Sequence, residues 1–311
     1  MISHWDEVEG RRREAGHIAG EWRRLTGAAT AKSGVSRVRV DPGRWSTPAH
    51  IHGAEEEIVY VLGGSGLSWQ DGTTYEIAVG DCIVHRAGEE AHTLRAGEEG
   101  LDALIFGLRV YDEAAVLPRA GAGWFGAGYI RLAGEEDHPW AREAAAGEPE
   151  VGEPAVRRDT IVNAAVVEPV VRDGATVGRR VRDLARAAGS EDTGLRISEV
   201  FAGKLNAAPH CHSAEEEIFV VLDGDGELEL YAEGPEPTER HAVRRGHVVA
   251  RRAGSGVAHA FRGGTGGLTL LMYGTRDTND VCYYPRSNKV YLSGVDIVAR
   301  LERLDFWDGE E

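Results

Sequence analysis

The chain has 311 residues, enough for two domains that each bury a core without disulfides. Its 51 acidic residues outnumber 35 basic ones, and the resulting net charge of -16 argues against nucleic acid or anionic lipid as a partner. Three widely spaced cysteines, no apolar run of roughly twenty residues and no secretory signal predict a protein of the reduced cytoplasm without a membrane span.

Short runs that alternate or are β-branched predict strands along most of the chain, and Gly, Asp or Pro separate them. The clearest runs are 35–40, 57–62, 75–84, 102–108, 196–201, 217–222, 227–231 and 268–273. Many short strands punctuated by turns predict an all-β protein of antiparallel barrels or sandwiches rather than a βαβ sheet. We expect helix only near Arg11 to Arg24 and in part of a linker.

The second half of the chain repeats the first. Residues 34–66 align with 194–226 without a gap, and 14 of these 33 positions are identical. Farther along, the offset grows to 167, as at Gly107 and Gly274. The acidic segment rich in Ala, Gly and Pro between the copies has no counterpart. We therefore predict an N-terminal domain at 1–132, a linker at 133–158 and a C-terminal domain at 159–311.

Each copy carries the same potential metal ligands. They are His50, His52, Glu57 and His92 in the first copy, and His210, His212, Glu217 and His259 in the second. Two histidines that are two positions apart on a strand point to one face and can chelate an ion. The glutamate follows at an odd spacing, so we expect the strand to break near 53–54 and near 213–214 before the carboxylate returns from a neighbouring strand.

The glutamate triplets leave a choice of ligand. Glu57 and Glu217 each lie seven positions before a turn glycine, Gly64 and Gly224, and this spacing favours them. Glu56 and Glu216 are the fallback ligands, although an acidic solvated edge is the simpler interpretation of the first two members of each triplet. Strand alternation turns Cys211 away from the ligands, so we expect it to be a buried apolar residue.

Three imidazoles and one carboxylate suit Fe, Mn, Ni, Cu or Zn as divalent ions, and the absence of thiolate argues against a closed structural zinc site. Four protein ligands leave two positions of an octahedral ion for water, dioxygen or substrate. One carboxylate leaves the site net positive, which favours an anionic ligand. We expect one ion per domain and a small-molecule substrate, and the sequence indicates no catalytic residue beyond the ligands.

These residues also carry a family resemblance. PAHIHGAEEEIVYVLGG after Gly43, and PHCHSAEEEIFVVLDG after Gly203, resemble the first cupin motif. GDCIVHRAGEEAH and GHVVARRAGSGVAH are similar to the second, with Arg86 and Arg252 where proline is usual. The chain thus resembles a bicupin, which implies two double-stranded β-helix (jelly-roll) barrels in tandem with the metal inside. Bicupins of this ligand type include oxalate decarboxylases and quercetin dioxygenases, and they often associate into homo-oligomers.

The leading hypothesis is a metal-dependent bicupin enzyme acting on a small oxygenated or acidic organic molecule, most simply as a dioxygenase-type oxidoreductase. A non-redox isomerase or lyase, in which the ion acts only as a Lewis acid, is the first alternative. A binding protein that holds metal or a metabolite without catalysis is the second. The doubled ligand set argues against that role, because a scaffold has no chemical need for it.

Overall fold

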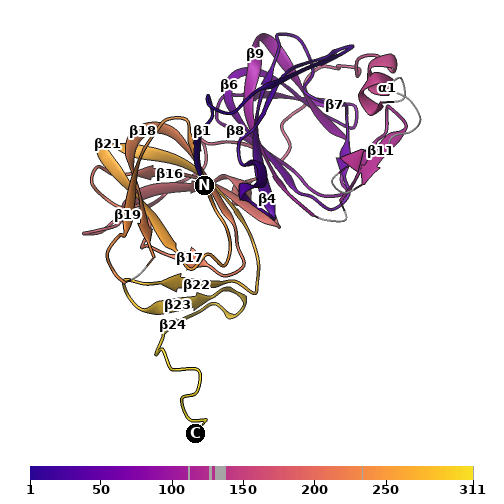
Figure 1. Ribbon diagram of the computed structural model, residues 1–311. Helices are drawn as coiled ribbons and strands as arrows, with labels where there is room; N and C mark the ends of the chain where they lie inside the picture. Colours follow the sequence, from indigo (N-terminus) through magenta and orange to yellow (C-terminus); the bar gives the residue numbers. More distant parts are fainter. Residues whose placement is uncertain (111–112, 126–127, 130–137, 233, 311) are drawn as a thin grey trace.

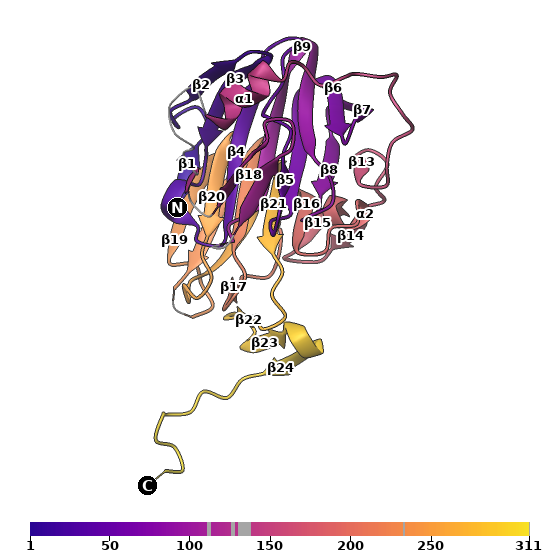
Figure 2. The ribbon, with the colours of Figure 1, turned by 90° about the vertical axis from the view of Figure 1, so that its right-hand side faces the viewer.

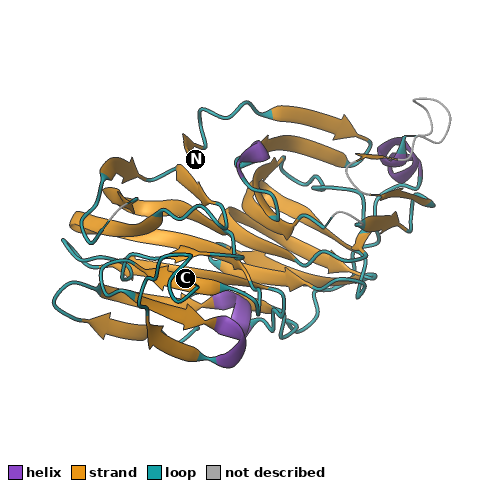
Figure 3. Cartoon of the chain, turned by 60° about the horizontal axis from the view of Figure 1, so that its bottom comes forward, coloured by secondary structure: helices purple, strands orange, loops and turns teal. Residues whose placement is uncertain are grey.

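The computed structural model describes residues 1–310 except 111–112, 126–127, 130–137 and 233. The chain folds into two β-barrels in tandem, one from each half, as the indigo-to-purple and orange regions of Figure 1 show. Strands dominate throughout, and helix is confined to short segments (Figure 3). The prediction of an all-β fold with two tandem barrels is confirmed.

The N-terminal barrel is built on an eight-stranded sheet whose strands all pair antiparallel. In order, it contains β13 (Ile161–Asn163), β8 (Asp81–His85), β6 (Glu57–Gln70), β9 (His92–Leu108), β4 (Ser33–Val40), β3 (Ile18–Arg24) and β2 (Arg11–Ala15), with β7 (Thr73–Ala78) paired to β6. A four-stranded sheet completes it, with β12 (Gly128–Tyr129), β11 (Ala122–Phe125), β10 (Ala114–Leu117) and β5 (Ile51–His52).

The C-terminal barrel repeats this plan. Its large sheet contains β1 (Ile2–His4), β20 (His247–Arg251), β18 (Glu217–Tyr231), β21 (Ala258–Thr275), β16 (Thr193–Val200), β15 (Gly178–Asp183) and β14 (Val170–Asp173), with β19 (Glu239–Arg244) paired to β18. Its small sheet contains β17 (Cys211–His212), β22 (Val281–Tyr284), β23 (Lys289–Leu292) and β24 (Ile297–Arg300), beyond which the chain extends away from the barrel (Figure 2).

The two barrels exchange strands. β1, at the start of the chain, pairs with β20 of the C-terminal barrel, whereas β13 pairs with β8 of the N-terminal barrel. Each short strand therefore extends the sheet of the other half. The division at 1–132 and 159–311 remains our proposal for the domains, and these two strands cross it.

Apolar side chains fill each barrel and also the space between the barrels. A single buried cluster contains Ile58 and Phe106 from one half and Ile218 and Tyr273 from the other. The rings of Phe106 and Tyr273, which are equivalent in the repeat, stack with their centroids 5.1 Å apart. Burial of such side chains contributes roughly 1.5–3 kcal/mol each, so the contact between barrels is part of the hydrophobic core.

The expectation of helix near Arg11 to Arg24 is wrong. This segment forms the hairpin of β2 and β3, which turns at Gly16 with a positive φ of 55°. Ile18 begins β3 fully buried beside Trp45, so tertiary packing decides the conformation. The linker does contain a helix, α1 (Pro139–Ala145), and α2 (Leu184–Ala187) follows later in the chain. No helix in the described ranges has the length and apolar character needed to span a bilayer.

Candidate metal centres

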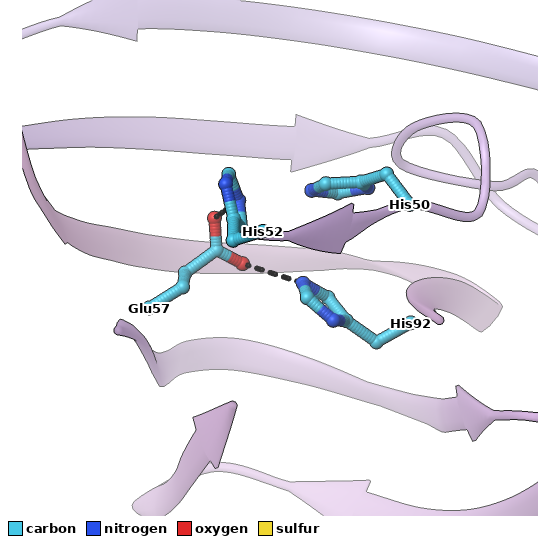
Figure 4. Close-up of side chains that lie close together, drawn as sticks. All are labelled: His50, His52, Glu57 and His92. Carbon is cyan, nitrogen blue, oxygen red and sulfur yellow. Dashed lines mark ion pairs between the residues drawn. The ribbon is translucent and has the colours of Figure 1, made fainter. Parts of the chain in front are cut away.

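The predicted residues of the N-terminal half come together at one point in their barrel (Figure 4). One potential ligand atom from each of His50, His52, Glu57 and His92 lies within 4.8 Å of all the others. Glu57 Oε2 is 3.6 Å from His52 Nε2, and its Oε1 is 3.5 Å from His92 Nε2. These spacings between donor atoms are those that a single ion could bridge.

Local backbone structure explains this convergence. β5 ends at His52, and the chain bends before β6 begins at Glu57, as the odd spacing of the glutamate predicts. At the bend, a side chain on Gly53 would approach Ala114 O to within 2.6 Å, so only glycine fits there. β9 supplies His92, whose backbone pairs with that of His50 in an isolated bridge.

The C-terminal half has an equivalent but looser arrangement. The Nε2 atoms of His259, His212 and His210 lie 3.0, 3.6 and 4.0 Å from Glu217 Oε2. The ligand atoms of His210, Glu217 and His259 all lie within 4.8 Å of one another, and so do those of His210, His212 and Cys282. This centre therefore has two overlapping groups of donor atoms that share His210.

Backbone carbonyls orient three of the imidazoles. Nδ1 of His50, His92 and His210 lies 2.9, 3.2 and 2.8 Å from the carbonyl oxygens of Pro48, Glu90 and Ala208. An Nδ1–H donated to a carbonyl leaves Nε2 as the atom with a lone pair for a metal. The rings are thus held with Nε2 toward the centre before any ion arrives.

Carboxylates that the sequence analysis missed orient the imidazoles of His52 and His212. Glu113 Oε1 lies 3.1 Å from His52 Nδ1, and Asp280 Oδ2 lies 2.7 Å from His212 Nδ1. Glu113 also accepts hydrogen bonds from the backbone N–H groups of Gly53 and Ala54, so it fixes the bend as well. Glu113 and Asp280 are 167 positions apart, which is the offset of the repeat in this region, and this spacing could have revealed them.

Burial and mutual charge set the protonation of the ligands. Burial alone would raise the pKa of Glu57, but hydrogen bonds from His52 and His92 hold it well below its usual range. Burial lowers the pKa of His52, but hydrogen bonds to Glu57 and Glu113 outweigh it and raise this pKa to about 9. Burial lowers the pKa of His210 to about 4, helped by the neighbouring histidines. The carboxylates are thus ionised and ready to face a cation.

His85 distinguishes the two centres. Its ring stacks on that of His92, with centroids 3.8 Å apart and planes 5° from parallel. Its repeat equivalent is Arg251: His85 pairs with Glu57 across the sheet, and Arg251 pairs with Glu217. The second centre therefore has a permanent positive charge where the first has an imidazole. Sequence spacing alone gave no sign of this role.

The residues fit a transition metal. Among the described residues, the buried atoms His92 Nε2, His259 Nε2 and Glu217 Oε2 have no partners other than the facing candidate ligands: His92 Nε2 lies 3.5 Å from Glu57 Oε1, and His259 Nε2 lies 3.0 Å from Glu217 Oε2. Burying polar atoms away from water costs free energy, and one cation in each barrel would coordinate the facing atoms of that barrel. Neutral imidazole with carboxylate suits first-row divalent ions.

A cavity of about 920 Å³ reaches the C-terminal centre. His210, His212 and Glu217 lie in its wall, and Tyr284 stacks on His210 with ring centroids 5.7 Å apart. Basic side chains line another part of the wall: Arg172, Arg179, Arg196 and Lys289. Acidic side chains are present too, namely Glu191, Asp192, Glu215 and Asp277.

The first two glutamates of each triplet are not a solvated edge. Glu56 and Glu216 are only 1% and 2% exposed, and each accepts hydrogen bonds from the opposite barrel. Because their carboxylates are engaged there, neither serves as the alternative metal ligand. Glu55 accepts the N–H of Val110 at 2.9 Å. Cys211 is buried in an apolar cluster with Leu205, as strand alternation predicts.

Comparisons with known proteins agree with this architecture. Residues 36–106, which include the four N-terminal candidate ligands, match the family model described as cupin domain. No curated protein sequence matches the chain. The match thus identifies a cupin domain over this stretch of the N-terminal half.

Several solved structures share the fold. An oxalate decarboxylase of Lactobacillus farciminis in complex with formate has a TM-score of 0.61 and 14% identity, over 89% of this chain and 86% of that one. The Bacillus subtilis oxalate decarboxylase at pH 4.6 has a TM-score of 0.59 and 14% identity, over 89% and 76%. Another structure of the Bacillus subtilis enzyme, from work on its Mn(II) centres, has a TM-score of 0.59 and 14% identity, over 90% and 78%.

Proposed function

We propose that this protein is a metal-dependent cupin enzyme with one divalent ion in each barrel. The ligands are His50, His52, Glu57 and His92 in the first barrel, and His210, His212, Glu217 and His259 in the second. The observation that carries the proposal is the convergence of oriented imidazoles and an ionised carboxylate on one buried point in each barrel. The Mn(II) centres of the Bacillus subtilis oxalate decarboxylase, which shares this fold, make Mn(II) a candidate beside Fe, Ni, Cu and Zn.

The substrate is a small oxygenated organic anion that binds in the C-terminal barrel. The cavity of about 920 Å³ brings the candidate ligands His210 and Glu217 into one space with basic side chains. Arg172 and Arg179 lie directly opposite each other on β14 and β15. Neither makes an ion pair with any described carboxylate, although like charges in cross-strand contact repel. An acid group of the substrate would neutralise them.

The reaction is of the dioxygenase type. A redox-active ion held by these residues would supply Lewis acidity and electron transfer. The chain itself positions the substrate: the arginines attract the anion, and Tyr284 forms an aromatic wall beside His210. Burial alone would raise the pKa of Glu217, but His259 and the other histidines hold it well below its usual range, so the carboxylate stays ionised at neutral pH and can face a cation.

The protein functions in a reducing compartment, consistent with a cytoplasmic location. Cys82, Cys211 and Cys282 are all buried and free. Disulfides would be expected to form and persist in an oxidising compartment, where paired cysteines are common.

Elemental analysis tests the metal centres directly. Protein expressed without added metal should contain an ion in each barrel, and His50→Ala and His210→Ala should each remove one of them. Oxygen uptake is then measured with candidate enols, diols and hydroxy acids. Turnover that persists with Zn(II) and without oxygen would replace the dioxygenase by a non-redox lyase or isomerase. Absence of bound metal in all preparations, even after loading with Mn(II) or Fe(II), would overturn the proposal.

A further inference from the structure

The C-terminal centre contains a sulfur atom that the N-terminal centre lacks. Cys282 on β22 lies directly opposite His212 on β17, and its side chain is 2% exposed. Its Sγ and the ligand atoms of His210 and His212 all lie within 4.8 Å of one another. In the N-terminal barrel the residue opposite His52 is Ala115, which has no donor atom.

Strand alternation gives Cys282 this position. Neighbouring residues on a strand face opposite sides, and Cys211, which lies opposite Tyr283, belongs to the apolar cluster behind β17. Cys282 therefore shares the metal-facing side with His212. The next residue on that face is Tyr284, where the N-terminal barrel has Leu117.

The distances between donor atoms also separate the two centres. In the N-terminal barrel the four donor atoms all lie within 4.8 Å of one another, so nitrogen and oxygen atoms alone form a compact set. In the C-terminal barrel, His210 belongs to two groups, one with Glu217 and His259 and the other with His212 and Cys282. An ion held by His210 and His212 would therefore have the Cys282 sulfur within reach.

We propose that Cys282 is a thiolate ligand of the metal in the C-terminal centre, whereas the N-terminal centre is bound by nitrogen and oxygen alone. The inference rests on the proposed function and assigns this centre a fifth protein donor. As the metal–sulfur bond forms, the thiol loses its proton to solvent, and neither sulfur nor metal changes oxidation state. Thiolate favours softer ions, so this centre should bind copper, Co(II) or Zn(II) in preference to Mn(II), and of these only copper and Co(II) would support the proposed redox reaction.

A bound cation, rather than the protein, would have to supply the positive charge beside the sulfur. Arg251 takes the place of His85 in this barrel and lies across the sheet from Glu217, which it attracts. Burial and the neighbouring carboxylates of Glu217 and Asp280 raise the pKa of the Cys282 thiol to about 12, so the thiol keeps its proton until a metal replaces it. The basic wall of the cavity can still attract an anionic substrate.

Co(II) substitution tests the proposal without a substrate. The full-length protein is loaded with Co(II), its metal content is measured by elemental analysis, and its absorption spectrum is recorded in the near ultraviolet. We expect an intense thiolate-to-Co(II) charge-transfer band, which Cys282→Ser abolishes without emptying the N-terminal centre. Cys211→Ser is the matched control, because this second buried thiol faces the apolar cluster, and its band should be unchanged.

The outcomes separate this inference from the proposed function. Co(II) bound in both barrels without a thiolate band, or with a band that survives Cys282→Ser, would overturn the thiolate ligand and leave the metal centres intact. Failure of both barrels to bind Co(II), Mn(II) or Zn(II) would overturn the metal centres and this inference together. In competition between equimolar Zn(II) and Mn(II), Cys282→Ser should lower the bound share of Zn(II), whereas Cys211→Ser should not.

Discussion

Individual side chains show how the candidate centres are organised before a metal arrives. The ligand His52 meets Glu57 at Nε2 and Glu113 at Nδ1, and His212 is held in the same way by Glu217 and Asp280. A carboxylate behind a ligating histidine fixes the ring and raises its basicity. The same carboxylate also attracts a proton when the metal is absent, so metal and proton compete for these two imidazoles.

This competition predicts proton release on metal binding. Burial lowers the pKa values of His52 and His212, but neighbouring carboxylates outweigh it and raise both to about 9. Metal-free protein at pH 7.5 therefore carries a proton on each ring, so the N-terminal centre should release about one proton as it binds an ion, and the C-terminal centre about two, because the Cys282 thiol loses its proton as well. Calorimetric titration with Zn(II) in buffers of different ionisation enthalpy measures these numbers, and the contribution of the imidazoles should fall toward zero above pH 9.

The raised pKa of His52 also affects the stability of the metal-free protein. Because the folded pKa is above the reference value near 6.5, the stabilisation from His52 is fully present below pH 6.5 and is lost as the pH rises through about 9. Glu113→Gln is the matched variant, since it removes the charge and keeps the shape. It should reduce proton release in the N-terminal barrel alone. Release that is independent of pH and of Glu113 would contradict the assignment.

At the scale of strands, the sequence pattern predicted the long strands well and the short strands poorly. β6 and β18 were predictable because their residues are β-branched or apolar and a matching turn glycine follows each start. Gly64 adopts a φ of 75°, and any side chain there would collide with Gly100 O. β1 has only three residues and carries no periodic signal. Its partner is fixed by packing against the other barrel, which no local pattern encodes.

Site residues divide in the same way. The candidate ligands could be proposed from the sequence because their spacing repeats, and His52 and His212 could be recognised as equivalent on that basis alone. Cys282 could not be proposed in this way, because it reaches the site only through the pairing of its strand with one some 70 residues earlier in the sequence. The equivalent residue in the other barrel is an alanine, so the repeat gave no signal. The hairpin of β2 and β3 was mistaken for a helix because its basic residues show no clear alternation.

The pairing of β14 with β15 leads to a prediction about substrate binding. Arg179 faces the cavity, and burial together with Arg196 and Arg172 lowers its pKa, so it should gain from an anionic ligand. Arg179→Met should weaken binding of succinate, used as a probe dicarboxylate, to the Zn(II)-loaded protein by about 10–100-fold, the range expected for lost hydrogen bonds to a charged group. Isothermal titration measures the affinity.

A matched control lies one residue away. Arg180 points to the other face of β15, where its Nη1 is 2.9 Å from Glu199 Oε2, so Arg180→Met should leave succinate binding unchanged. Equal affinity in wild type and Arg179→Met would exclude this arginine from anion recognition. A wild-type protein that binds neither succinate nor malonate would count against an anion site in this cavity.

Across the whole molecule, the barrels hold each other through reciprocal carboxylates. Glu56 of the first barrel accepts hydrogen bonds from Ser190 Oγ at 2.6 Å and Glu191 N at 3.0 Å. Glu216 of the second accepts the N–H groups of Ala31 and Lys32 at 2.8 and 2.9 Å. Each carboxylate directly precedes a candidate metal ligand in the chain. The same contacts that join the barrels thus also fix where β6 and β18 begin.

This interlock predicts that the two barrels unfold together. Exchanged strands, a shared apolar core and two buried carboxylates cross the interface, so chemical denaturation should show one transition by both fluorescence and circular dichroism. Glu56→Gln removes the charge and leaves one acceptor for several donors, which should lower the free energy of unfolding by about 2–3 kcal/mol. Glu216→Gln should have an effect of similar size, whereas Glu76→Gln, at an exposed position on β7, should change it little. Two separate transitions, with Glu56→Gln shifting only one, would show that the barrels are energetically independent despite the strands they exchange.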